Sequence, residues 1–208
     1  MGVDEPRPAA TVIAARESEG HVEVLVLQRS TRSRFLPGYV VFPGGAVDAG
    51  DEELARRWFG DAAEATRACA IRELAEETGL ALTAAGLASS EDLGAVEASP
   101  PPPSALRQIS HWIAPEEVPV RFDARFFAVR AATRAEPSAD GAEAARAWWA
   151  DPRELLSEFE AGRCELYWPT LKTMEALARC STVEEVLALD IPQVEEDEDE
   201  GASSERRG

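Results

Sequence analysis

Three glutamates stand close together in one segment of this 208-residue chain, and their spacing predicts that they share one face of a helix. Glu73, Glu76 and Glu77 are related as i, i+3 and i+4, which at about 100° per residue places three carboxylates along one stripe. Such carboxylates repel one another unless a positive group lies among them. A hard divalent cation with oxygen ligands, Mg²⁺ first and Mn²⁺ second, is the candidate for that group. The alternative is the solvated face of an amphipathic helix.

The stripe belongs to a helix that we expect over residues 61–78, ended by Gly79. A shorter helix is expected before it, over residues 51–59. The face opposite the glutamates carries small and apolar side chains that can pack on a sheet. The members of this packing face are Ala68, Ile71, Leu74, Ala75 and Thr78.

The segments on either side of the glutamate helix predict a mixture of strands and helices. Residues 11–15 and 21–28 alternate across a polar turn and indicate a β-hairpin. Residues 84–97 and 133–141 have no clear periodicity, and we expect loops with weak helix there. This mixture indicates an α/β or α+β fold. Further strands are expected over 39–42, 109–114 and 122–130, and further helices over 152–160, 169–178 and 182–189.

Composition restricts the class of protein. Acidic residues number 39 against 21 basic ones, giving a formal net charge of −18, which disfavours binding to nucleic acid and to anionic membrane surfaces. No apolar run is long enough to span a bilayer, and three scattered cysteines indicate reduced thiols, so we expect a cytoplasmic protein. We expect a disordered lead-in over 1–10, one domain over 11–192 and a disordered acidic tail over 193–208.

The residues around the glutamate stripe resemble the Nudix box. Its pattern is Gly, five residues, Glu, seven residues, then Arg-Glu-hydrophobic-x-Glu-Glu-x-Gly-hydrophobic, and the turn at residues 42–45, Phe-Pro-Gly-Gly, matches the strand end that precedes it. The matching residues within the box are Arg72, Glu73, Leu74, Glu76, Glu77, Gly79 and Leu80.

The first part of the box departs from the pattern. Glu64 precedes Arg72 by the required seven residues, but eighteen residues instead of five separate it from Gly45. We therefore expect a helical insertion over about residues 46–63. Glu64 has a rival interpretation, because Asp61 and Glu64 also resemble a capping box at a helix start.

The resemblance implies a Nudix α/β/α sandwich with a mixed sheet, this insertion and extra C-terminal helices. It also implies a diphosphatase in which Glu73, Glu76, Glu77 and the Gly45 carbonyl hold Mg²⁺, which would polarise phosphoryl oxygens and lower the pKa of the attacking water. Arg72 would pair with Glu64 or Glu73 and keep the stripe ordered. Structural roles in the box fall to Glu64, Gly44 and Gly79.

The general base is left open between a helix carboxylate and an acid outside the box. Glu143, which precedes Trp148 and Trp149, is the first outside candidate, and Asp140 is the second. Each could equally be a solvent-exposed acid in a polar loop.

Motifs outside the box resemble the Nudix branch that contains peroxisomal coenzyme A diphosphatase. They include residues 27–30, 35–38, 112–115 and 121–127. The implied substrate is a small nucleotide, coenzyme A or an acyl ester first, with ADP-ribose, NADH or binding without cleavage as alternatives. A scaffold acting through its acidic tail is a further alternative, and a homodimer stays open. A basic cluster suited to a 3′-phosphate, or merely solvated, consists of Arg29, Arg32 and Arg34.

Overall fold

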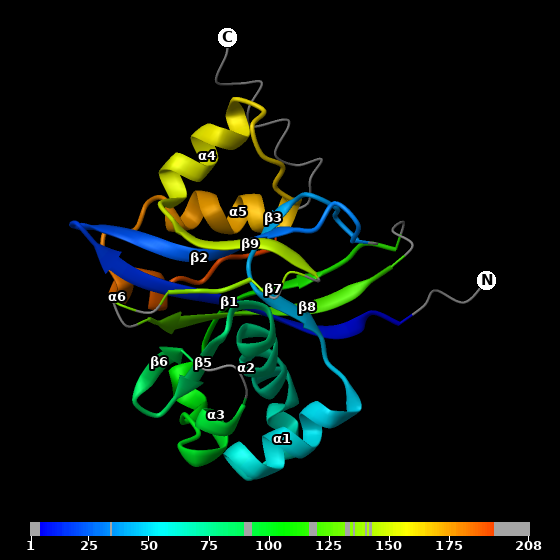
Figure 1. The fold of residues 1–208 in the computed structure, drawn as a ribbon. Helices are drawn as coiled ribbons and strands as arrows, with labels where there is room; N and C mark the ends of the chain where they lie inside the picture. Colours follow the sequence, from blue (N-terminus) through cyan, green and yellow to red (C-terminus); the bar gives the residue numbers. More distant parts are fainter. Residues whose placement is uncertain are drawn as a thin grey trace.

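The structure is a computed structural model in which a mixed β-sheet crosses the middle of the molecule and helices cover both of its faces (Figure 1). This is the α/β sandwich expected from the sequence. Seven strands of the described part of the chain belong to this sheet, and two more form a separate hairpin. The described residues are 5–33, 35–89, 93–116, 120–131, 134, 136–139, 141 and 143–193.

Strand β1 (Arg7–Ser18) is the central strand and changes its antiparallel partner along its length. Its first half pairs with β4 (Gly44–Ala46) and its last residues pair with β2 (His21–Arg29). Its other edge pairs in parallel with β8 (Phe122–Arg130) from Arg7 onward. The expected disordered lead-in over 1–10 is therefore wrong from Arg7, because this part of β1 takes its hydrogen bonds from two neighbouring strands.

The remaining strands extend the sheet on both sides. Strand β2 pairs with β3 (Val40–Val41) and with β9 (Ala144–Ala150), and β8 pairs with β7 (Arg107–Ile113). The hairpin β1–β2 and strands β7 and β8 confirm the sequence-based expectations. Strand β9 was not expected, because its sequence contains no β-branched residue.

One face of the sheet is covered by α1 (Ala49–Phe59), the 3₁₀ turn η1 (Ala62–Glu64) and α2 (Ala65–Thr78). The expected packing face of α2 is buried, and Gly79 ends the helix in a left-handed conformation with φ 63°. Residues 86–89, which are expected to be loop or weak helix, instead form one strand of a hairpin. Their small side chains weaken the strand signal in the sequence. The smaller elements on this side are β5 (Leu80–Thr83), β6 (Gly86–Ser89), α3 (Gly94–Ala98) and the turn η2 (Pro103–Ala105).

The other face is covered by the C-terminal helices α4 (Pro152–Glu160), α5 (Trp168–Leu177) and α6 (Val183–Leu187). These are the extra helices expected from the sequence. No helix within the described residues is long and apolar enough to cross a membrane. The acidic tail expected over 193–208 lies outside the described residues apart from Gln193.

Candidate active site

A cavity of about 650 Å³ lies where α2, β4 and the start of α5 approach one another. The change of partner along β1 creates this place, because β4 and β2 pair with the same edge of β1 at different positions. β4 pairs with residues 9–11 of β1, and β2 pairs with residues 15–18. The cavity has an ionic half and an apolar half. The ionic half is lined by Arg29, Gly44, Gly45, Arg72, Glu73, Glu76, Glu77 and Glu143.

Two glycines allow β4 to fit closely between β1 and α2. A Cβ atom on Gly44 would overlap the backbone of β1, and a Cβ atom on Gly45 would overlap the Glu73 carboxylate. The Gly44 amide donates a hydrogen bond of 2.9 Å to Oε2 of Glu77. The Gly45 carbonyl faces α2 as well, since the Cys69 thiol donates to it at 3.6 Å. The Phe-Pro-Gly-Gly turn therefore fixes how far the glutamate stripe stands from the sheet.

Arg72 holds the stripe together. Its Nη1 atom donates to Glu73 at 2.8 Å and to Glu76 at 2.9 Å. Its Nε and Nη2 atoms donate to the two carboxylate oxygens of Asp51 at 2.8 and 3.0 Å. Asp51 is fully buried and also accepts from the Asp48 amide at 2.9 Å, closing a reciprocal cap at the start of α1. Charge-assisted bidentate pairing of this kind is strong, and it links the inserted helix to the site.

The structure corrects the role expected for Glu64. Glu64 forms an ion pair with Arg67 near the surface, while Asp51 takes the place beside Arg72. The sequence contained the signal, because five residues separate Gly45 from Asp51, which is the spacing of the box itself. The insertion therefore follows the acidic residue of the box instead of preceding it. This position holds an aspartate, whereas the pattern of the box has a glutamate there.

Burial changes the acidity of two glutamates in the stripe. Burial raises the pKa of Glu77 to about 8, against a smaller lowering by the hydrogen bond from Gly44. Glu73 and Glu143 raise the pKa of Glu77 further, while Arg29 lowers it. The pKa of Glu73 is also raised, chiefly by burial, although Arg72 opposes the shift. Both carboxyls would be stabilised as anions by an added cation.

Glu143, which precedes β9, and Arg29, the last residue of β2, also line this half of the cavity. The Glu143 carbonyl accepts from the Ser30 amide at 2.8 Å, which fastens the residue before β9 to the loop after β2. Arg29 donates from Nε to the Phe35 carbonyl at 3.0 Å. Arg32 is exposed and does not line the cavity, so of the two described arginines of the predicted basic cluster the structure brings only Arg29 to the site. Arg34 and Asp140 lie outside the described residues.

The oxygen ligands at this site fit a hard divalent cation, although the carboxylates do not converge on one position. Across the residues described, no three Asp, Glu, His or Cys side chains are arranged as ligands. One carboxylate oxygen each of Glu73 and Glu76 accepts a hydrogen bond from Arg72. One oxygen of Glu77 accepts a hydrogen bond from the Gly44 amide. Three carboxylates and a backbone carbonyl are nevertheless the ligand types that Mg²⁺ prefers.

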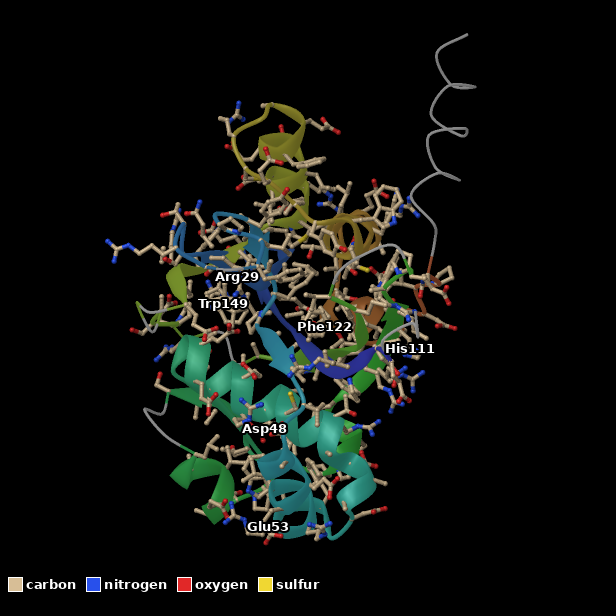
Figure 2. The ribbon with its side chains drawn as sticks, turned by 90° about the vertical axis from the view of Figure 1, so that its right-hand side faces the viewer. Arg29, Asp48, Glu53, His111, Phe122 and Trp149 are labelled. Carbon is tan, nitrogen blue, oxygen red and sulfur yellow. The ribbon has the colours of Figure 1, made fainter. Side chains whose placement is uncertain are left out.

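The other half of the cavity is apolar. The ring centroids of Phe35 and Phe122 lie 5.8 Å apart, and those of Phe35 and Tyr167 lie 6.2 Å apart, both edge to face. Ile113 and Val120 also line this half. We name the five residues the apolar mouth. Figure 2 shows Arg29 and Phe122 at the height of the sheet, above α2 and below α5.

Known proteins that are similar to this chain identify its family. The NUDIX domain family model matches residues 5–167. Nudix hydrolase 7 of Caenorhabditis elegans is 30% identical over 191 residues, which are 83% of this chain and 61% of that protein. The chain thus spans less than two thirds of this relative.

Solved structures show the same fold. A NUDIX hydrolase from Alicyclobacillus acidocaldarius has 30% identity and a TM-score of 0.74, covering 91% of this chain and 99% of its own. The NUDIX domain of Shewanella oneidensis NrtR, solved with ADP ribose, has 15% identity and a TM-score of 0.55, covering 85% and 88%. Its low identity makes it evidence for the fold alone. The chain belongs to the Nudix family.

Proposed function

We propose that this protein hydrolyses the diphosphate bond of a small nucleoside diphosphate derivative, with coenzyme A and its acyl esters as the favoured substrates. The observation that carries the proposal is the ionic half of the cavity. There the helix of the Nudix box presents Glu73, Glu76 and Glu77 beside the Gly45 carbonyl. In this reaction water adds to one phosphorus, the P–O–P bridge breaks, and two phosphate monoesters leave.

The reaction must neutralise phosphate oxygens and hold a water in line with the breaking bond. A divalent cation held by Glu73, Glu76, Glu77 and the Gly45 carbonyl would act as a Lewis acid toward those oxygens. Arg72 keeps two of these carboxylates in place through its hydrogen bonds. Its own position is fixed by the buried Asp51.

A carboxylate of the cavity wall would accept the proton from the attacking water. Glu77 has a pKa raised to about 8 by burial, and it becomes a competent base when a positive charge nearby lowers that pKa. Glu143 lines the same half of the cavity and remains the candidate outside the box.

The preference for coenzyme A rests on the branch motifs and on the cavity lining. Arg29 supplies a guanidinium for a phosphate group of the substrate. Trp112 and Trp168 line the same cavity and supply apolar surface for the remainder. A cavity of this size is within the usual range for a small-molecule site.

The test is a panel assay with Mg²⁺ and four substrates: coenzyme A, dephospho-coenzyme A, ADP-ribose and NADH, with products identified by mass. Release of 3′,5′-ADP and phosphopantetheine from coenzyme A is the expected result. Cleavage of only the other compounds would keep the reaction and remove coenzyme A. Failure to cleave any of them, with Mg²⁺ or Mn²⁺, would leave a module that binds nucleotides without hydrolysis.

A further inference from the structure

The first turn of α5 brings hydrogen-bond donors to a part of the cavity wall that holds neither the glutamates nor Arg29. We propose that this turn binds a terminal phosphoryl dianion, distinct from the diphosphate that is cleaved, through the amide and the hydroxyl of Thr170. The phosphoryl group belongs either to free inorganic phosphate or to a phosphate monoester elsewhere on the substrate. Such a site goes beyond the proposed function, because it binds its ligand without a metal and without hydrolysis.

The turn borders the cavity from the side opposite the glutamates. Residues 167–170, which are the N-cap and the first turn of α5, all line the cavity. Leu166, just before them, forms a parallel bridge with Val40 of β3. Figure 1 shows α5 and α2 on opposite faces of the sheet, with β3 beside α5. An anion at this turn would therefore be separate from one at the glutamate stripe, although both lie in one cavity.

No side chain caps the start of α5. Its N-cap, Tyr167, makes no side-chain capping hydrogen bond, and the first turn contains no acidic residue. In contrast, Asp48 caps α1 and Asp151 caps α4. Intrahelical bonding in α5 begins with the Leu171 amide, which donates to the Tyr167 carbonyl at 2.9 Å. The positive end of the helix dipole therefore lies at the cavity wall, where it favours an anion.

Thr170 supplies the second, independent observation. It is only 6% exposed and lines the cavity, and among the described residues neither its amide nor its hydroxyl has a hydrogen-bond partner. The fully enclosed side-chain atoms without a partner are the indole nitrogens of Trp58 and Trp112, so the Thr170 hydroxyl keeps some accessible surface. Thr173, one turn later, instead donates to the Pro169 carbonyl at 2.7 Å. Because unpaired donors in a buried place are unfavourable, a ligand that accepts from both donors of Thr170 is favoured.

The charges around the turn favour an anion over a neutral acceptor. The Lys172 ammonium lies 4.5 Å from the centre of the Trp168 ring in the first turn, and it pairs with Glu175 at 3.0 Å. The carboxylates of the described residues that line the cavity all belong to the ionic half, so none stands beside Thr170. A phosphoryl group offers several oxygens, which can accept from the amide and the hydroxyl together and gain from the helix dipole.

A ligand with two separate phosphate groups would use both ends of the cavity. One group would lie beside Arg29 in the ionic half and the other at Thr170, since both residues line one cavity of about 650 Å³. For such a ligand the inference rests on the proposed function for the position of the first group. Free phosphate would occupy the Thr170 end alone.

The experiment is isothermal titration calorimetry of the metal-free protein, in a chelating buffer at about pH 8, with inorganic phosphate, AMP and adenosine 3′,5′-bisphosphate. Thr170→Val removes the hydroxyl but keeps the shape and the amide. It should weaken phosphate binding about tenfold, which is typical of a lost hydrogen bond to a charged group. Thr170→Ser keeps a hydroxyl and should bind within about threefold of the wild type. Thr173→Val is the matched control, because it makes the same change in α5 at a buried hydroxyl that does not line the cavity.

A loss in Thr170→Val that Thr170→Ser and Thr173→Val do not show supports the site. If the loss is confined to inorganic phosphate, the ligand is the free ion. A larger loss for the bisphosphate than for AMP assigns the site to a monoester of the substrate.

No binding of inorganic phosphate or of the bisphosphate by the wild type would overturn the proposal. Equal affinities in the wild type and Thr170→Val would do the same, as would a loss of phosphate binding that only Arg29→Gln produces. An equal loss in Thr173→Val would assign the effect to the packing of α5. Hydrolysis with Mg²⁺ is measured separately, so phosphate binding at Thr170 without cleavage would refute only the proposed reaction.

Discussion

The two halves of the cavity are built from the chain in different ways. Three carboxylates of the ionic half, those of Glu73, Glu76 and Glu77, lie within five consecutive residues of α2, and a single turn at β4 supplies the glycines. The apolar mouth collects side chains from the loop after β2, the end of β7, the start of β8 and the residue before α5. A local spacing therefore encodes the first half, whereas only the pairing of distant strands creates the second.

The strongest way to separate the halves is to remove a carboxylate of the ionic half. Glu76→Gln or Glu77→Gln should lower kcat by about 10²- to 10⁴-fold, because each removes a candidate metal ligand or base. Val120→Ala in the apolar mouth should leave kcat for free coenzyme A within about twofold. Steady-state rates with product analysis by mass check both.

Glu52→Gln is the matched control for these glutamate variants. Glu52 is an exposed helical glutamate that pairs with Arg56, as Glu76 pairs with Arg72. Its replacement should not change kcat. Full turnover in both Glu76→Gln and Glu77→Gln would contradict the assignment of this cavity half as the active site.

The next prediction compares two acids that compete for one role. Asp51→Asn should lower the free energy of unfolding by about 3–5 kcal/mol, because it leaves the mostly buried Arg72 guanidinium without its bidentate partner. Glu64→Gln breaks a pair near the surface and should cost less than about 1 kcal/mol. Urea unfolding of the metal-free protein measures both. Equal losses would mean that Glu64 shares the role of Asp51.

These comparisons also show how far the sequence predicts the molecule. Periodicity located α2, the hairpin β1–β2 and the strand β8, because each buries a regular set of side chains. It missed β9, whose hydrogen bonds come from β2 more than a hundred residues away in the chain. Strand pairing over such a separation leaves little trace in local residue patterns.

In the candidate site, too, the residues in a local sequence pattern were predicted and others were not. The stripe of Glu73, Glu76 and Glu77 lies on one cavity wall, as its spacing indicates. Asp51 was missed because the insertion was placed on the wrong side of it. The basic cluster was treated as one unit, although a loop can direct Arg29 inward and Arg32 outward within three residues.

That difference between neighbouring arginines gives a smaller, sharper test. Arg29→Gln should lower kcat/KM for coenzyme A by about tenfold, which corresponds to the loss of about 1.5 kcal/mol from a hydrogen bond to a charged group. Arg32→Gln is the matched control and should change kcat/KM by less than about twofold, because Arg32 does not line the cavity. A larger effect at Arg32 than at Arg29 would place the phosphate groups outside the cavity.

A pH dependence of stability is also expected to originate in the ionic half. The pKa of Glu77 in the folded protein is raised to about 8 from 4.5. Between these values the folded state holds a proton that the unfolded state has released, so the contribution of Glu77 to stability falls as pH rises through this window and is constant above it. The melting temperature of the metal-free protein should therefore fall by up to about 10 °C from pH 5 to pH 8 on this account.

Glu77→Gln isolates this contribution, because the amide does not titrate. The difference in melting temperature between wild type and Glu77→Gln should change with pH in metal-free buffer. Added Mg²⁺ should raise the wild-type melting temperature more at pH 8 than at pH 5, since a cation stabilises the ionised carboxyl and competes with its proton. A rise in melting temperature with Mg²⁺ that is equal at both pH values would show that the cation does not affect the ionisation of Glu77. The acidic stripe would then be divided between catalysis by Glu76 and packing by Glu77.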